Sequence, residues 1–230
     1  MSQTIFNPHW ENNIYSQNQQ LNRYPYDSVV SFVYRFHPRN IPISDTKIIE
    51  VGCGSGNNLW FAAREGFQVS GIDGSKTAID FAKNRFKEEK LSGDFIVGDF
   101  TNLPYEDNHF QIAIDRGSIT CVPLEYGIKA IEEAYRVLAP GGLFFSNLYS
   151  VEHTSFTEEE SDGNGFCANI TQGTIRDAKA TCFYNEERMK KAFGSREWVI
   201  LSKRKIIDHD FINESYGTLA QWIVIARKGK

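Results

Sequence analysis

Three glycines and two nearby carboxylates are the residues in this sequence whose types and spacing best suit ligand binding. Gly52, Gly54 and Gly56 alternate with other residues directly after an apolar run that contains Glu50. Glycine has no Cβ and accepts positive φ, so such a turn lets the backbone approach a ligand closely. Asp73 ends the next apolar run, where a carboxylate can accept hydrogen bonds from a ribose diol. The pattern predicts a site for a ribose-containing ligand.

The glycine spacing separates this turn from the dinucleotide-binding pattern. A dinucleotide turn follows G-x-G-x-x-G, which would place its last glycine at position 57. Position 57 is Asn and the third glycine is Gly56, so the spacing here is G-x-G-x-G. A nicotinamide oxidoreductase shares the same fold logic, but this spacing disfavours it.

Four motifs in this order resemble the class I S-adenosylmethionine-dependent methyltransferases. They are Glu50 to Gly56, Gly71 to Ser75, Val97 to Phe100 and Pro140 to Gly142. The resemblance covers roughly residues 45–148. It implies S-adenosylmethionine as the cofactor, S-adenosylhomocysteine as the product and a Rossmann-like fold.

The resemblance also assigns the cofactor to particular residues at the strand ends. Asp73 suits the ribose diol, Asp99 suits the adenine amino group, and Phe100 suits the face of the adenine ring. The cofactor-binding residues that it implies are Glu50, Gly52, Cys53, Gly54, Asn57, Asn58, Asp73, Gly74, Ser75, Asp99, Phe100 and Asp115.

Candidate catalytic residues follow the fourth and fifth expected strands. Asp115 and Arg116 stand where this family reaches the methionine end of the cofactor or the acceptor, and the alternative is a buried ion pair without a chemical role. His153 is the histidine nearest the expected acceptor side. Methyl transfer is an in-line displacement, so positioning supplies much of the rate. Asp115 alone is not a carboxylate cluster, so we expect no metal.

Strand-like and helix-like segments alternate, which predicts an α/β fold with a doubly wound, mostly parallel sheet and helices on both faces. The resemblance supplies seven strands in the order 3-2-1-4-5-7-6, with the last strand antiparallel. The expected strands cover residues 47–51, 68–73, 94–97, 110–114, 142–148, 198–207 and 221–227. The expected helices end at about residues 36, 64, 90, 138 and 193, and Asp27, Ser75 and Asn185 are the expected caps of the first, third and fifth.

The chain is expected to divide into an N-terminal helical cap or lid, residues 1–37, and a methyltransferase domain, residues 38–230. Aromatic residues are costly to leave in water, so part of the N-terminal segment should pack on the domain. The lid hypothesis places Tyr15, Arg23, Tyr24 and Tyr26 on the acceptor side, and the alternative is a tail packed on the back. Residues 150–178 are expected to form an inserted loop, either for selectivity or as a solvated acidic surface.

Composition limits the class of partner. The net charge is −4 and no long basic run occurs, which argues against nucleic acid. Four scattered cysteines without a C-x-x-C pair indicate neither a zinc site nor a disulfide framework. The sequence shows no apolar signal core and no run of about 18 apolar residues, so we expect a cytoplasmic protein without a membrane partner. The oligomeric state is left open.

These observations predict methyl transfer from S-adenosylmethionine to an oxygen or nitrogen of a small molecule. Residues 21–27 and 57–61, with Asp115 and Arg116, resemble a bacterial subgroup associated with surface-polysaccharide or nonulosonic-acid pathways. This narrower resemblance implies a sugar or sugar nucleotide as the acceptor. The alternatives are a regulatory protein that binds the cofactor without transfer, and a protein or nucleic-acid methyltransferase.

Overall fold

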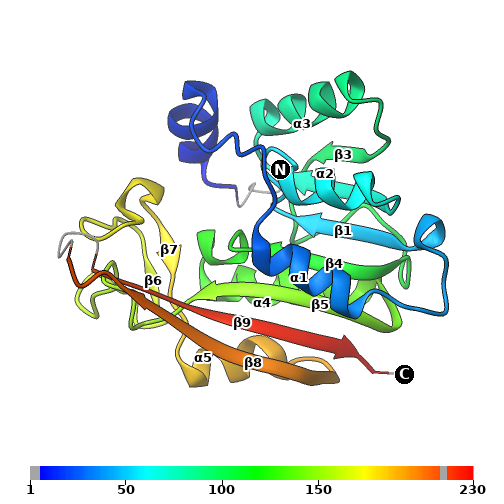
Figure 1. Cartoon of the computed structure of the whole chain (residues 1–230). Helices are drawn as coiled ribbons and strands as arrows, with labels where there is room; N and C mark the ends of the chain where they lie inside the picture. Colours follow the sequence, from blue (N-terminus) through cyan, green and yellow to red (C-terminus); the bar gives the residue numbers. More distant parts are fainter. Residues whose placement is uncertain (1–5, 213–216, 230) are drawn as a thin grey trace.

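The computed structural model describes residues 6–212 and 217–229 (Figure 1). Its strands are β1 (Lys47–Val51), β2 (Gln68–Asp73), β3 (Asp94–Val97), β4 (Phe110–Arg116), β5 (Leu138–Tyr149), β6 (Phe166–Cys167), β7 (Thr181–Cys182), β8 (Trp198–His209) and β9 (Thr218–Lys228). The α-helices are α1 (Asp27–Phe36), α2 (Asn57–Arg64), α3 (Lys76–Glu88), α4 (Leu124–Val137) and α5 (Glu186–Gly194).

Seven strands form one sheet in the order β3-β2-β1-β4-β5-β9-β8. The first five pair in parallel, and β9 runs antiparallel to both β5 and β8. The short strands β6 and β7 pair with each other in a separate ladder. With those two set aside, the sheet follows the expected order 3-2-1-4-5-7-6, and the expected α/β class is confirmed.

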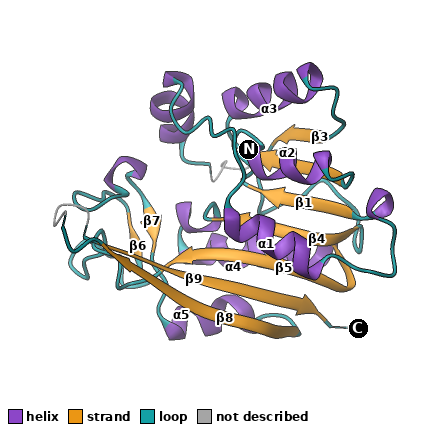
Figure 2. Ribbon diagram, in the orientation of Figure 1, coloured by secondary structure: helices purple, strands orange, loops and turns teal. Residues whose placement is uncertain are grey.

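Helices cover both faces of this sheet (Figure 2). On one face α1, α2 and α3 pack against alternate residues of the strands, among them Ile48 and Phe145. On the other face α4 and α5 cover the residues between, among them Ile49 and Phe144. Side chains point to opposite faces in turn along a strand, so strands covered on both sides are apolar throughout. The buried sequence of β1 is therefore a direct consequence of its central place.

Two expected helix caps are confirmed and one is wrong. The Ser75 hydroxyl accepts a hydrogen bond from the Ala78 N–H at 3.0 Å, and the Asn185 side chain accepts one from the Arg188 N–H at 2.9 Å. Tyr26, in an extended conformation, holds the cap position of α1, and Asp27 is the first helical residue. An acid in the first turn still favours the helix through its dipole, which explains why Asp27 suits either position.

The N-terminal segment and the insertion lie at the same end of the sheet. Residues Trp10–Ile14 and Tyr15–Gln17 form two short helical turns, and β6 and β7 belong to the part of the chain after β5. In Figure 1 the dark blue turns and β6/β7 both lie beyond the end toward which β1 points. Ligands of parallel α/β sheets bind at that end of the strands. The fold therefore brings two sequence-distant segments to the expected site.

Candidate functional site

A cavity of about 290 Å³ opens at the carboxyl ends of β1, β2 and β4. Ligand pockets range from roughly 300 to 1,000 Å³, so this one suits a small ligand. The predicted residues that line it are Glu50, Gly52, Cys53, Gly54, Asn57, Asn58, Asp73, Gly74, Phe100, Arg116, Tyr15 and Tyr26. Ser75, Asp99, Asp115, His153, Arg23 and Tyr24 are not among its lining residues.

Asp73 organises the glycine turn. One of its carboxylate oxygens accepts a hydrogen bond from the Gly54 N–H at 2.8 Å, and the other accepts one from the Ser75 N–H at 2.8 Å. Gly54 has a φ of +50°, and a Cβ there would lie 2.8 Å from the Tyr15 hydroxyl. Burial raises the pKa of Asp73 to about 6, against the effect of its two backbone donors. Asp73, at the end of β2, therefore fixes the conformation of the glycine turn.

Glu50 brings a buried carboxyl group with one unused oxygen to the cavity. Its side chain accepts a hydrogen bond from the Asn58 amide at 2.6 Å, while Oε2 is buried without a hydrogen-bond partner. Burial, reinforced by the charges of Asp115 and Asp73, raises the pKa of Glu50 to about 8. Buried polar atoms are normally satisfied, so the free oxygen fits a donor on a ligand.

Asp115 acts on the backbone that follows β4 and does not line the cavity. One oxygen accepts hydrogen bonds from the Ser118 N–H at 2.9 Å, the Ser118 hydroxyl at 2.8 Å and the Ile119 N–H at 3.0 Å. The other oxygen accepts the Ser146 hydroxyl at 2.8 Å. The alternative of a buried Asp115–Arg116 ion pair is therefore wrong. Asp115 sets the course of the turn that carries Arg116.

Arg116 extends along the cavity and stacks on an aromatic ring. Its guanidinium carbon lies 4.0 Å from the centre of the Tyr26 ring. Its Nε is buried and has no hydrogen-bond partner. A stacked guanidinium keeps its in-plane N–H donors free for an oxyanion.

The segment 22–26 is tied to the glycine turn. The Ser55 hydroxyl donates to the Asn22 carbonyl at 2.8 Å, and the Asn57 amide donates to the Tyr24 carbonyl at 2.8 Å. The side chains of Arg23 and Tyr24 turn away from the cavity, since Arg23 lies over Phe81 and Tyr24 is 79% exposed. Their contribution here is made by the backbone.

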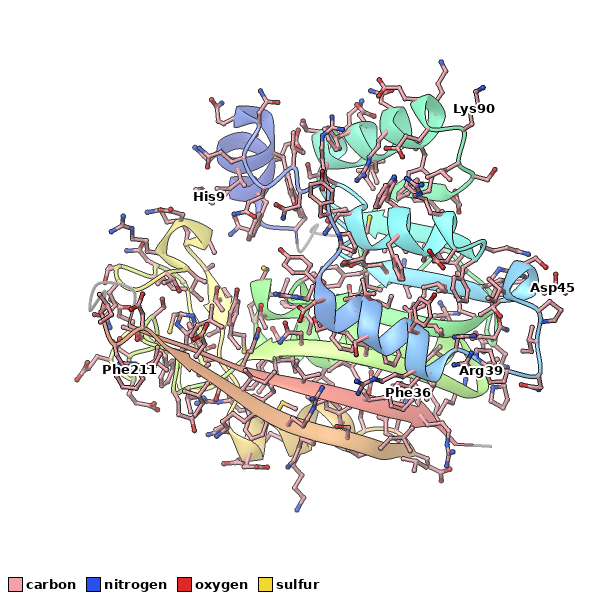
Figure 3. All side chains as sticks on the ribbon, in the orientation of Figure 1. His9, Phe36, Arg39, Asp45, Lys90 and Phe211 are labelled. Carbon is pink, nitrogen blue, oxygen red and sulfur yellow. The ribbon has the colours of Figure 1, made fainter. Side chains whose placement is uncertain are left out.

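Residues 9–15 form a cover over the cavity, and two side chains anchor it. The Glu11 carboxylate accepts hydrogen bonds from the Thr77 hydroxyl at 2.6 Å, the Thr77 N–H at 3.2 Å and the Ser75 hydroxyl. The His9 Nε2 lies 2.9 Å from the Asp177 carbonyl oxygen in the insertion. Figure 3 labels His9 on the side of these turns that faces the insertion. The N-terminal segment therefore bridges α3 and the insertion.

Three predicted residues have other contacts in the structure. His153 is buried, its Nδ1 accepts the Ser155 N–H at 3.0 Å, and burial lowers its pKa to about 4. Asp99 accepts a hydrogen bond from the Thr101 N–H at 2.8 Å, and this bond closes the turn that contains Phe100. Ser75 caps α3 and contacts Glu11.

The cavity also has lining residues that sequence reasoning missed. They include Phe6, Trp10, Tyr149, Thr174, Ile175 and Asp177. Tyr149 could have been found from its place at the carboxyl end of a strand, and Trp10 from the aromatic character of the N-terminal segment. Thr174 to Asp177 lie in a stretch of the insertion without a motif, so no local signal marks them.

The described residues bear on two kinds of partner, a membrane and a metal ion. No helix there combines the length and apolar character that a bilayer crossing needs. No group of three or more His, Cys, Asp and Glu side chains in the described ranges is arranged to hold a metal ion. The expectations about membrane and metal stay predictions.

Comparisons with known proteins show similarity to methyltransferases in the central part of the chain. A family profile described as "Methyltransferase domain" matches residues 48–142. A phthiotriol/phenolphthiotriol dimycocerosates methyltransferase of Mycobacterium tuberculosis is 29% identical over 114 residues, 49% of this chain and 41% of that protein. A fatty-acid O-methyltransferase of Mycolicibacterium smegmatis is 29% identical over 131 residues, 56% of this chain and 44% of that protein. The matches span less than half the length of these two relatives.

A solved structure extends the likeness to the whole fold. The SAM-dependent methyltransferase of Methanosarcina mazei superposes with a TM-score of 0.67 at 18% identity, over 90% of this chain and 99% of that chain. At this level of identity the similarity establishes the shared fold.

Proposed function

We propose that this protein, whose residues 48–142 match a methyltransferase domain, transfers a methyl group from S-adenosylmethionine to an oxygen or nitrogen of a small molecule. The observation that carries the proposal is the cavity in which the glycine turn, Asp73 and Glu50 meet. The relatives act, by their names, on dimycocerosates and fatty acids, so the family admits acceptors of several kinds. A sugar acceptor stays a prediction.

The residues of the cavity fit the cofactor in three ways. The free Glu50 Oε2 suits an ammonium group, as at the amino acid end of S-adenosylmethionine. Asp73 lies beside the turn and suits the ribose diol, and Phe100 offers an aromatic face to the adenine. The glycines have no side chains, so the ligand can lie close to the backbone of the turn. Asp115 would act through the backbone it orders.

The chain has to supply orientation and a closed site more than it has to supply a reactive group. When bound, S-adenosylmethionine supplies an electrophilic methyl group on a positively charged sulfur. In-line displacement gains most from reactants held within about 3–3.5 Å of each other. An acceptor that arrives deprotonated needs no base from the protein. In this proposal Arg116, Tyr26 and the cover over the cavity orient the acceptor.

The N-terminal segment is proposed as a lid with a fixed root. Residues 22–26 are tied to the turn by Ser55, Asn57 and Asn58. Asn18 and Gln20, just before that root, both have positive φ, at 58° and 56°. Non-glycine residues rarely adopt this conformation, which favours a hinge there. Opening at this hinge would uncover the cavity, and closing it would exclude water.

Calorimetry on the whole chain tests the proposal first. We expect binding of S-adenosylmethionine and S-adenosylhomocysteine, and no binding of NAD. Incubation with methyl-labelled S-adenosylmethionine and pooled small acceptors, followed by mass spectrometry, then tests transfer. Tight NAD binding without S-adenosylmethionine binding would contradict the cofactor assignment. Cofactor binding with no transfer to any pool would favour the regulatory alternative.

A further inference from the structure

The wall of the cavity that holds Arg116 suits an acidic ligand. Resting on the proposed function, we infer that the methyl acceptor carries an acidic group, a carboxylate, phosphate or sulfate, and that the Arg116 guanidinium binds this group. The inference concerns the acceptor end of the cavity, for which no sequence motif is available. It makes Arg116 a residue that determines specificity.

The first observation is the state of the Arg116 side chain. Among the described residues that line the cavity, it is the only Lys or Arg. Its buried Nε has no partner, and its guanidinium carbon lies over the Tyr26 ring. The N–H edge of a guanidinium matches two oxygens of a carboxylate, phosphate or sulfate.

The second observation is that the acids around the cavity are used elsewhere. Asp73 accepts the Gly54 and Ser75 N–H groups, and Asp115 serves the turn after β4. The Asp177 side chain is 83% exposed and lies 3.9 Å from Arg176. None of the described acids forms an ion pair with Arg116.

Glu50 does not neutralise Arg116 in the free protein either. Burial raises the pKa of Glu50 to about 8, and the nearby positive charge of Arg116 lowers that pKa by less. A carboxyl group with this pKa is mostly protonated at neutral pH. The positive charge of Arg116 is therefore left for a ligand.

The surfaces around Arg116 add an apolar component. Trp10, Tyr15 and Tyr149 line the cavity with Tyr26, and the rings of Trp10 and Tyr15 lie 6.0 Å apart between centres. The Trp10 indole N–H is buried beside the Cys121 thiol, which also lines the cavity. Flat aromatic walls suit an apolar body that carries a polar group. Together with Arg116, they favour a compact organic acid as the acceptor.

The test uses the full chain saturated with S-adenosylhomocysteine and matched pairs of small probes. Benzoate is compared with benzamide, and phenyl phosphate and phenyl sulfate are compared with phenol, by calorimetry or ligand-detected NMR. We expect the wild type to bind at least one acid more tightly than its neutral partner. The acid that binds best distinguishes a carboxylate from a phosphate or sulfate.

Substitutions then assign the preference to one side chain. Arg116→Gln should weaken the acid roughly tenfold or more, because a charge-assisted pair is lost, and should leave the neutral probe unchanged. Arg116→Lys keeps the charge without the planar edge and should lose less. The matched control is Arg64→Gln, which removes a guanidinium stacked over Trp60 on the exposed surface of α2 and should change nothing.

Three results would overturn the inference. The acids could bind no better than their neutral partners, or not bind at millimolar concentration. Arg116→Gln could weaken S-adenosylhomocysteine as much as it weakens the acid, which would assign the guanidinium to the cofactor. A wild type that fails to bind S-adenosylhomocysteine at all is a separate result, and it would overturn the proposed function itself.

Discussion

The two walls of the cavity are built in different ways. The wall that we propose for the cofactor, the cofactor wall, comes from residues 50–58 and 73–74, which lie on consecutive elements of one β-α-β unit. The wall that we propose for the acceptor, the acceptor wall, combines residues 6–26 and 116–122 with Tyr149 and residues 174–181. In the cofactor wall the hydrogen bonds Asn58–Glu50 and Gly54–Asp73 join residues 8 and 19 positions apart, whereas Glu11–Thr77 and His9–Asp177 join residues 66 and 168 positions apart.

The two walls therefore depend on different parts of the chain in order to form. The cofactor wall follows from one glycine turn and two strand-end acids, so it forms with the sheet itself. The acceptor wall needs the N-terminal segment and the insertion to meet, and few buried apolar contacts enforce that meeting. Segments of this kind belong to the low-stability end of a protein and open most readily. We therefore expect the acceptor wall to open while the cofactor wall stays formed.

The largest expected effect is in the cofactor wall. Gly54→Val should abolish binding of S-adenosylmethionine, because a β-branched residue resists a φ of +50° and its Cβ would lie 2.8 Å from the Tyr15 hydroxyl. Calorimetry with S-adenosylhomocysteine measures the loss. Gly194→Val at the end of α5 is the control, since a Cβ there meets nothing within 4 Å. Unchanged affinity in folded Gly54→Val would show that the turn does not face the cofactor.

Deletion of residues 1–20 should remove methyl transfer and leave a cooperatively unfolding domain. The reason is that the root at residues 22–26 keeps its hydrogen bonds to the turn while the cover is lost. Glu11→Gln, which weakens only the anchor on α3, should give a smaller loss. Activity is measured on the acceptor found by the pooled screen.

Limited proteolysis sharpens the same point in the intact chain. Cleavage near residues 18–20 should be fast in the free protein and slow with S-adenosylhomocysteine bound. Equal cleavage in both states, together with full activity after the deletion, would contradict the lid.

A smaller effect is expected from the acid that ends β2. Asp73→Ala should weaken S-adenosylhomocysteine about tenfold or more, since charge-assisted hydrogen bonds contribute roughly 1.5–3 kcal/mol each. Asp80→Ala removes an exposed carboxylate from α3 and is the matched control. If Asp73→Ala binds like Asp80→Ala, the ribose is held elsewhere.

The smallest effect is a pH dependence that involves Glu50. The ammonium of the cofactor favours the ionised carboxylate, so affinity for S-adenosylhomocysteine should rise as pH increases toward about 8. The limit is about tenfold per pH unit for one proton. Glu50→Gln should flatten this profile, and the exposed Glu88→Gln should not. A wild-type profile as flat as that of Glu50→Gln would contradict the role.

The same group predicts a stability change of known sign. The pKa of Glu50 is raised in the folded chain, so its contribution to stability is present below about 4.5 and is lost as pH rises through about 8. The melting temperature of the free protein should therefore fall over that range, and Glu50→Gln should reduce the fall. Bound S-adenosylhomocysteine should reduce it as well.

Local patterns predicted the central elements closely. The bounds of β1, β2 and β3 and the end of α2 agree with expectation, because these short segments are bounded by glycine or polar turns. Agreement is poorer around α4 and β5. The structure begins β5 at Leu138, four residues before the expected Gly142, because Leu138 already pairs with Phe110 in an extended conformation.

Site residues divide along the same line. Gly54, Asp73 and Glu50 are recognisable from sequence because one turn requires their types at that spacing. Arg23 and Tyr24 were expected in the cavity by residue type, but the Tyr24 carbonyl accepts a hydrogen bond from Asn57 and the Arg23 carbonyl accepts one from Arg85 on α3. A hydrogen bond accepted by a backbone carbonyl does not depend on the identity of the residue, so sequence reasoning could not separate these two from Tyr26.

The sequence by itself determined the alternation of strands and helices and the cofactor wall, because both depend on residues that are neighbours along the chain. Tertiary structure decided which side chains face the acceptor. Asp115 and His153 accept hydrogen bonds from backbone N–H groups inside the protein. Arg116 instead lies over the Tyr26 ring, and its Nε has no hydrogen-bond partner. Which polar groups are satisfied and which stay free depends on partners brought in from distant positions, and that is settled only when the chain is packed.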